Sequence, residues 1–206
     1  MLSKQKIHKA YLLLSAIVVL HGTLLTMIDD GQWNIDRLRY YTVISNLLVA
    51  VGFLLILVLY NSKGALRYYI SYSMLICIAL TALTYNGILV PLAGANIFFS
   101  DYPNFATHLF SALLVFINYL AFEQKGMFTF KHILAGAVVP ALYYVVFVSI
   151  GPIIDFYPYF FMAPPLIGWP MVFVWFGCIT IGLFILSFLL VLFDKGLGKK
   201  HTVRSL

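Results

Sequence analysis

The segment YYTVISNLLVAVGFLLILVLY, residues 40–60, contains no charged side chain and is long enough to cross a lipid bilayer as one helix. Crossing the hydrocarbon core takes about 20 residues in a helix that rises about 1.5 Å per residue. The strongly polar residues of the segment, Thr42, Ser45 and Asn46, all lie in its first two turns, and their spacing of three and four residues places them on one face. The segment therefore predicts a membrane helix with a polar face near one end.

Five further runs of similar character lie on either side of it. Hydrophobic residues make up 63% of the chain and charged residues 10%, with a mean hydropathy of +0.98, which is far from the composition of a soluble domain. We predict an all-α polytopic membrane protein, with residues 1–206 forming a single domain and no separate soluble part. The six spans are expected at roughly 10–28, 40–60, 68–92, 104–123, 131–151 and 166–193.

The basic residues predict the orientation. Eleven of the thirteen Lys and Arg fall on one side of the predicted spans, and only Arg37 and Arg39 fall on the other. The positive-inside rule then places both termini in the cytoplasm. We expect the chain to be a multi-pass protein of the plasma (inner) membrane. The first span is expected to be retained, because Thr26-Met27-Ile28-Asp29 does not resemble a signal-peptide cleavage site. The net charge of +6 is thus a topology signal, and no nucleic-acid partner is expected.

Converting residue positions into depth brings polar groups of four spans to one level. A histidine inside a span is costly and indicates function by default, which draws attention to His108 near the outer end of the fourth span. We predict a polar chamber in the outer leaflet, walled by apolar helices. Its expected members are Thr42, Ser45 and Asn46 of the second span, His108 and Ser111 of the fourth, His21 of the first, Tyr85 and Asn86 of the third, and Tyr157 and Tyr159 of the outer loop before the sixth span.

Each of these groups also has a purely structural interpretation. Ser and Thr in membrane helices often bond their own backbone, and Asn often joins two helices. His21 neighbours Gly22, where two helices can approach closely. The aromatic, proline-containing segment 151–161 can cover the chamber as a lid or rest on the lipid headgroups. Cys77 and Cys178 are expected to be small buried apolar residues.

Threonine and histidine together indicate acyl-transfer chemistry. A threonine hydroxyl is a weak nucleophile that needs an adjacent base, and neutral imidazole is the usual one. Thr42 is the candidate nucleophile and His108 the candidate base. Asn46 or Asn86 could donate to the developing oxyanion, with Ser45 as a further orienting group. No carboxylate lies inside a span near His108, so a dyad is expected and not a triad.

The common alternatives leave no signature in this sequence. The chain has no Gly-x-Ser-x-Gly elbow, no His-Glu-x-x-His motif and no acid pair inside a span. No Cys or His pair has the spacing of metal ligands, so neither a metal nor a cofactor is expected.

Four short motifs together resemble a known family. They are Tyr41-Thr42-Val43-Ile44-Ser45-Asn46-Leu47-Leu48, Thr84-Tyr85-Asn86, His108, and Tyr157-Pro158-Tyr159-Phe160. In order and spacing, from about residue 36 to 195, they are similar to the six-helix androgen-induced-gene/ADTRP-like membrane proteins and their bacterial relatives. The resemblance implies a hydrolase of fatty acid esters of hydroxy fatty acids (FAHFA), with Thr42 and His108 as its catalytic pair.

Two other classes remain open. A non-catalytic lipid or sterol binder could use the same chamber. A small transporter needs polar groups along its whole path, whereas the cytoplasmic halves of the spans read as almost purely aliphatic and aromatic, and no internal repeat is visible. The hydrolase interpretation includes a lipid substrate that enters sideways from the bilayer.

Overall fold

The computed structural model describes residues 3–62, 64–94 and 101–204. Lys63, which contributed to the predicted orientation, lies outside the described residues. For Lys199, Lys200 and Arg204 only the backbone is described.

The prediction of six membrane helices is confirmed. Six helical stretches are long and apolar enough to cross a bilayer, so the chain is a multi-pass membrane protein. The first of them begins at Lys4, earlier than predicted, because the Ser3 hydroxyl caps it by accepting from the Lys6 amide at 3.3 Å. The helices are α1 (Lys4–Leu25), α2 (Tyr41–Val58), α3 (Leu66–Thr84), α4 (Val90–Ala93), α5 (Tyr102–Phe105), α6 (Ser111–Phe122), α7 (Phe130–Ile154) and α8 (Pro164–Arg204).

Two of the six spans contain a turn of π-helix. In the third span, η2 (Tyr85–Leu89) joins α3 to α4, and in the fourth span η3 (Ala106–Phe110) joins α5 to α6. Such turns displace side chains from the ordinary helical register and are frequent at functional sites.

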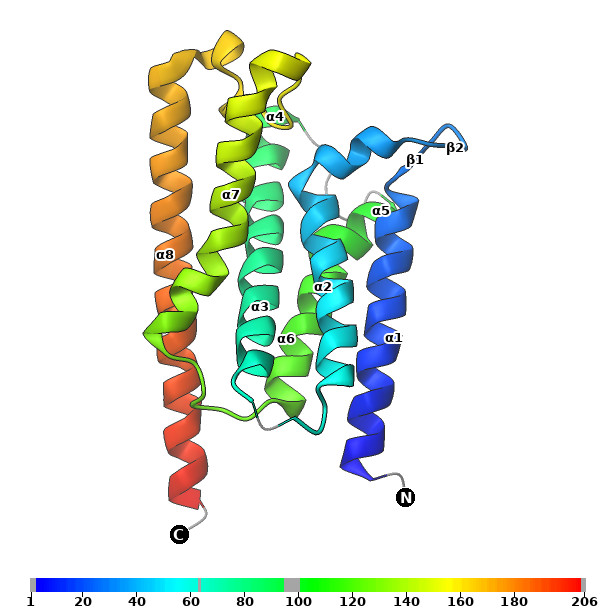
Figure 1. Ribbon diagram of the computed structural model, residues 1–206, viewed down its shortest axis with the longest axis vertical. Coiled ribbons are helices and arrows are strands. Elements are labelled where there is room, and N and C mark those ends of the chain that lie inside the picture. Colours follow the sequence, from blue (N-terminus) through cyan, green and yellow to red (C-terminus); the bar gives the residue numbers. More distant parts are fainter. Residues whose placement is uncertain (1–2, 63, 95–100, 205–206) are drawn as a thin grey trace.

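The connections between spans are short. A hairpin of β1 (Ile28–Asp29) and β2 (Gln32–Trp33), followed by the 3-10 turn η1 (Ile35–Arg39), joins α1 to α2. A second 3-10 turn, η4 (Phe160–Met162), precedes α8. The start of α1 and the end of α8 lie at the same end of the bundle (Figure 1), which we call the terminal end, and the hairpin and η4 lie at the opposite, distal end.

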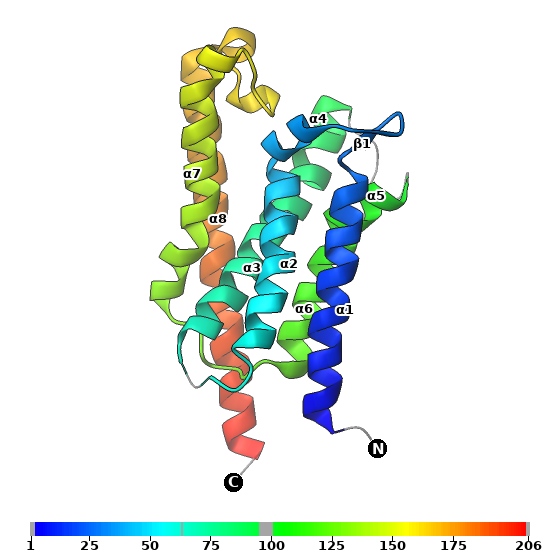
Figure 2. The same cartoon turned by 45° about the vertical axis from the view of Figure 1, so that its right-hand side comes forward.

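Helix α3 is central in the bundle. It contacts α2, α6, α7 and α8. Figures 1 and 2 show α7 and α8 running side by side, while α1, α2 and α6 form the other part of the bundle. At Gly168 the backbone departs from helical geometry, with φ at +75°, so the first turn of α8 bends away from the rest of the helix.

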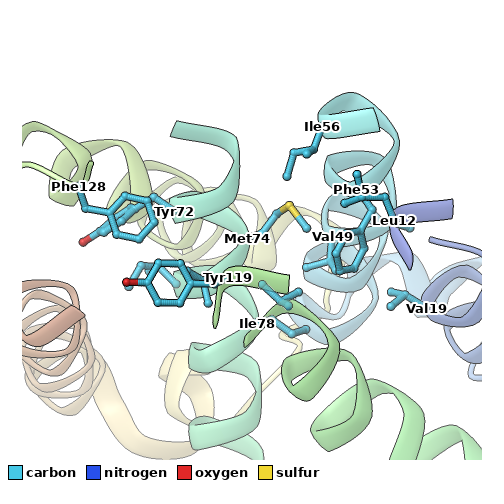
Figure 3. Close-up of a cluster of buried hydrophobic side chains, with 14 of the residues drawn as sticks. Leu12, Val19, Val49, Phe53, Ile56, Tyr72, Met74, Ile78, Tyr119 and Phe128 are labelled. Carbon is cyan, nitrogen blue, oxygen red and sulfur yellow. The ribbon is translucent and has the colours of Figure 1, made fainter. Parts of the chain in front are cut away.

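The larger apolar core lies mainly between α1, α2, α3 and α6 and also takes in buried residues of α7 and α8, and side chains from different helices point toward one another in it (Figure 3). Leu12, Phe53 and Tyr72 are fully buried there. Many large apolar residues, including Leu142, Phe173 and Ile181, are instead exposed on the outer surface. Because lipid tails solvate such side chains, this surface fits a membrane environment.

The terminal end holds buried polar groups, which corrects the expectation of an almost purely aliphatic and aromatic cytoplasmic half. His8 Nε2 lies 2.9 Å from Asn118 Oδ1, and the amide of Asn118 donates to Glu123 at 3.1 Å. Arg67 forms an ion pair with the same carboxylate at 3.3 Å. Asp194, also fully buried, accepts from the Tyr119 hydroxyl at 2.8 Å.

Hydropathy along single spans did not reveal this cluster, because its members come from four helices, with Arg67 in α3, His8 in α1, Asp194 in α8, and Asn118, Tyr119 and the C-cap residue Glu123 in α6. Several of the buried groups pair across the fold, which is the usual condition for burying charge, whereas Glu123 Oε2 and Arg67 Nε have no hydrogen-bond partner among the described residues. The prediction that the cytoplasmic halves of the spans hold almost no polar groups was the main observation against a transporter, and it no longer applies.

Candidate active site

Thr42 and His108 meet at the distal end of the bundle. The Oγ1 atom of Thr42 lies 3.3 Å from Nε2 of His108, so the predicted hydrogen-bond reach between the two side chains is confirmed. The contact is longer than an ordinary hydrogen bond of this type, as is common for catalytic pairs without substrate. The His108 side chain is buried, whereas Thr42 is partly exposed.

The two π-helical turns position the histidine. His108 lies in η3, and Tyr85 is the first residue of η2. The two rings stack with their centroids 3.4 Å apart and their planes 19° from parallel. This stacking restrains the imidazole and directs Nε2 toward the start of α2, where Thr42 is the second residue.

The neighbours of His108 decide which ring nitrogen carries the proton. Nδ1 lies 3.1 Å from the backbone carbonyl oxygen of Asn104, which can only accept a hydrogen bond. The Thr107 hydroxyl, 3.3 Å from Nδ1, already donates to the carbonyl of Pro103 at 2.8 Å. Both partners therefore accept from Nδ1–H, and Nε2 presents its lone pair to the Thr42 hydroxyl. This is the tautomer that a general base requires.

A second layer of contacts holds Asn104 in place. The Tyr85 hydroxyl donates to Asn104 Oδ1 at 3.1 Å, and the Asn104 amide group donates to Asp101 at 2.7 Å. Asp101 also caps α5 by accepting from the Asn104 backbone amide at 2.8 Å. The backbone carbonyl of Asn104 thus takes the orienting position that a carboxylate occupies in a catalytic triad.

Hydrogen-bond donors surround the Thr42 hydroxyl. Thr42 lies in the first turn of α2, whose N-cap residue Tyr40 makes no side-chain cap, and the first helical bonds reach only the amides of Val43 and Ile44. Burial raises the pKa of Tyr159 to about 12. The backbone amides of Tyr41 and Thr42 precede the first helical bonds of α2, and Tyr159 lines the same cavity as Thr42, so these donors lie near the candidate nucleophile.

Two cavities meet at Thr42. The first, which we call the vestibule, has a volume of about 500 Å³ and is lined by polar as well as aromatic residues, including Arg37, Asn104 and His108. The second, which we call the apolar cavity, has a volume of about 160 Å³ and lies between α3, α7 and α8. Four residues line both cavities: Thr42, Tyr85, Leu89 and Tyr159.

The segment after α7 covers the vestibule. Pro158, Tyr159 and Phe160 line it, and the Tyr40 ring packs edge-on against Phe156 and Tyr159 at centroid distances of 5.9 and 6.1 Å. Residues 158–160 of the predicted loop therefore border the chamber, whereas residues 151–154 belong to the end of α7. Tyr157 instead packs against Gly151, where an added Cβ would lie 2.2 Å from the tyrosine ring, and it is not among the lining residues.

Arg37 is already paired where it borders the vestibule. Its guanidinium contacts both carboxylate oxygens of Asp29, at 2.6 and 3.1 Å. Hydrogen bonding from Arg37 lowers the pKa of Asp29 below its usual value. The pair ties the hairpin to η1 and fixes the polar rim of the vestibule.

Asn46 does not occupy the predicted position of an oxyanion donor. Its amide group donates to the carbonyls of Thr42 at 2.8 Å and Thr107 at 3.0 Å, and the residue is fully buried. Because both donors are used, Asn46 joins α2 to η3 and has none left for a substrate. Ser45 is also buried, bonded to Thr81 at 2.7 Å and to the Thr42 carbonyl at 3.1 Å.

Replacing Asn46 with leucine should therefore lower stability, since leucine has a similar size but leaves two buried carbonyls with fewer partners. We expect the free energy of unfolding to fall by roughly 1–3 kcal/mol, measured by thermal or denaturant unfolding in detergent. Asn86→Leu is the matched control, because Asn86 only donates to its own helix at Ala82. Loss of turnover at unchanged stability would instead restore Asn46 as an oxyanion donor.

Three other predicted members lie away from the vestibule. His21 is exposed and lies beside Tyr102, with Nδ1 3.4 Å from the hydroxyl. The close helix approach at Gly22 is confirmed, because a Cβ there would lie 2.5 Å from the Cβ of Ala106.

Ser111 is fully buried and donates to the Thr107 carbonyl, and Asn86 donates to the Ala82 carbonyl of its own span. Correct depth did not ensure the correct helix face for these residues.

Neither cysteine takes part in this site. Cys77 is buried as predicted, but Cys178 is exposed on α8, which corrects the expectation for that residue. Within residues 3–62, 64–94 and 101–204, no group of three or more His, Cys, Asp and Glu side chains could hold a metal ion.

No family model, curated protein or solved structure matches this chain.

Proposed function

We propose that this membrane protein is a carboxylic ester hydrolase of lipids, with Thr42 as nucleophile and His108 as general base. The observation that carries the proposal is the contact between the Thr42 hydroxyl and the unprotonated Nε2 of a buried, doubly oriented histidine. A hydroxyl next to such a base, with donors at hand for an oxyanion, is the minimal equipment for acyl transfer.

The proposed reaction has two steps, acylation of Thr42 and hydrolysis of the acyl-threonine. Thr42 Oγ1 attacks the ester carbonyl carbon while His108 Nε2 takes the hydroxyl proton, and the proton then passes to the departing alcohol as the ester C–O bond breaks. Water attacks the resulting acyl-threonine, His108 again takes a proton, and its return to Thr42 releases the carboxylic acid. The donors that we assign to the oxyanion are the amides of Tyr41 and Thr42 at the start of α2 and the hydroxyl of Tyr159, which lines the same cavity as Thr42, in place of Asn46 and Asn86.

The two cavities favour an amphipathic substrate. An acyl chain fits the apolar cavity, the more polar part fits the vestibule, and the ester between them reaches Thr42 where the cavities meet. Fatty acid esters of hydroxy fatty acids, the substrates implied by the family resemblance, have this form.

Purified protein in lipid nanodiscs should hydrolyse such an ester, with free fatty acid measured by mass spectrometry. Bound ester recovered intact would support a lipid binder instead. Solute uptake into proteoliposomes without hydrolysis would support a transporter. These outcomes separate the three classes in one preparation.

We also propose that both termini face the cytoplasm of a plasma (inner) membrane, as the distribution of Lys and Arg favours. In a Cys178→Ala background, a membrane-impermeant maleimide should label Asp155→Cys but not Lys6→Cys in intact cells. Both positions are exposed, so accessibility of the side chain is matched. Labelling of Lys6→Cys alone would invert the topology.

A further inference from the structure

A groove on the membrane-facing surface runs between α3 and α8. Its volume is about 220 Å³, and apart from Thr84 its lining is apolar or weakly polar. Both helices belong to membrane spans, and Leu83 and Cys178 on the two sides of the groove are exposed at the level of the lipid tails. The groove residues are Leu80, Leu83, Thr84, Ile88, Trp175, Cys178, Ile179, Gly182, Leu183 and Leu186.

This groove and the apolar cavity share a wall. Leu80 and Thr84 of α3 and Ile179 and Leu183 of α8 line both of them. One layer of side chains therefore separates the bilayer from the cavity that reaches Thr42. Three of these side chains, Leu80, Thr84 and Ile179, are partly exposed, and rotamer changes of exposed side chains are far faster than a helix displacement.

A glycine leaves open space in the groove. Gly182 on α8 lines the groove, and a Cβ at this position would meet no other atom within 4 Å. The empty space beside Gly182 lies in the groove, so this helix contributes no side chain there. A large residue at 182 would fill the groove without displacing the backbone of a neighbour.

We propose that the contact between α3 and α8 is a lateral portal through which the acyl chain of a lipid ester passes from the bilayer into the apolar cavity. The inference rests on the proposed hydrolase function and assigns its route of substrate entry. An acyl chain fits this groove, because the groove faces lipid and is apolar. It also adjoins the apolar cavity and not the vestibule.

The portal and the vestibule then serve different parts of the substrate. An acyl chain that enters between α3 and α8 stays in apolar surroundings along its whole path. A small water-soluble ester can instead reach Thr42 through the vestibule and needs no portal. The two routes can therefore be tested separately with two substrates.

The test compares Gly182→Trp with Ile181→Trp, which adds the same bulk at the adjacent lipid-exposed position outside the groove. Each variant is assayed with two substrates. One is a long-chain ester dissolved in liposome membranes, and the other is p-nitrophenyl acetate in water. We expect Gly182→Trp to lower turnover of the long-chain ester by about tenfold or more and to leave acetate hydrolysis unchanged. Ile181→Trp should change neither.

A second block avoids any question of folding. Cys178 lines the groove and is exposed, whereas Cys77 is buried, so a bulky apolar maleimide added to the folded protein should modify Cys178 and reproduce the selective loss. Cys178→Ala should be insensitive to the reagent. Equal loss of both substrates, or loss of neither, would overturn the portal. Wild-type protein that hydrolyses neither ester would overturn the proposed function, and the portal with it.

Discussion

Thr42→Val should reduce ester turnover by at least about a thousandfold, because valine keeps the shape of threonine and lacks the attacking oxygen. Thr42 is partly exposed at the start of α2, and the apolar replacement removes the contact of its hydroxyl with His108 Nε2. Thr42→Ser should keep a measurable part of the activity, since its hydroxyl can still reach Nε2.

The matched control is Ser45→Ala, one turn further along the same helix. Ser45 is buried against Thr81 and lines neither cavity, so turnover should stay within a few fold of wild type even though a hydroxyl is lost. Turnover rates of a hydroxy-fatty-acid ester decide the matter. If Thr42→Val turns over the ester at the wild-type rate, Thr42 has no part in the mechanism.

His108→Phe should lower turnover by about a hundredfold to ten-thousandfold, the usual contribution of a general base. Phenylalanine preserves an aromatic ring for stacking on Tyr85 but offers no nitrogen to the Thr42 hydroxyl. Thermal unfolding should accordingly change less than it does for His108→Ala, which leaves the face of Tyr85 open.

The double variant Thr42→Val with His108→Phe should lose no more activity than the worse single variant. Members of one catalytic unit fail together, so their effects are far from additive. Multiplicative losses in the double variant would show that the two residues act independently, and the dyad would have to be abandoned.

The membrane helices could be predicted from the sequence because the physical signal is strong and local. A run such as residues 40–60 has no other stable environment than lipid, and its length fixes one crossing. The pairing of Thr42 with His108 followed from depth alone, since both lie in the first turns of spans that enter from the same side.

Depth does not specify which way a side chain faces. His21, Asn86 and Ser111 share the level of the dyad, but His21 lies beside the Tyr102 hydroxyl, and Asn86 and Ser111 donate to backbone carbonyls of their own spans. The two π-helical turns shift the register of the third and fourth spans, and hydrophobic periodicity gives no sign of them. The sequence also shows no sign of the backbone amides that we propose as oxyanion donors, because backbone amides are common to every residue except proline.

The buried polar groups at the terminal end of the bundle could not be predicted for a different reason. His8, Glu123 and Asp194 each look like an ordinary polar residue near the end of a span, where contact with water is expected. Only the packing of α1, α6 and α8 and the adjoining loop removes that water and joins them into buried groups. Such a cluster depends on tertiary structure alone.

The central claim is that His108 activates the Thr42 hydroxyl, and covalent labelling by a lipid-like fluorophosphonate tests it most directly. Attack by Thr42 Oγ1 on phosphorus forms an O–P bond and expels fluoride, and intact-protein and peptide mass spectrometry locate the added group. We expect one adduct per chain on Thr42 in the wild type and in Ser45→Ala, and none in Thr42→Val or His108→Phe. An adduct on another residue, or none at all in a preparation that hydrolyses the ester, would contradict the assignment of Thr42 as the nucleophile.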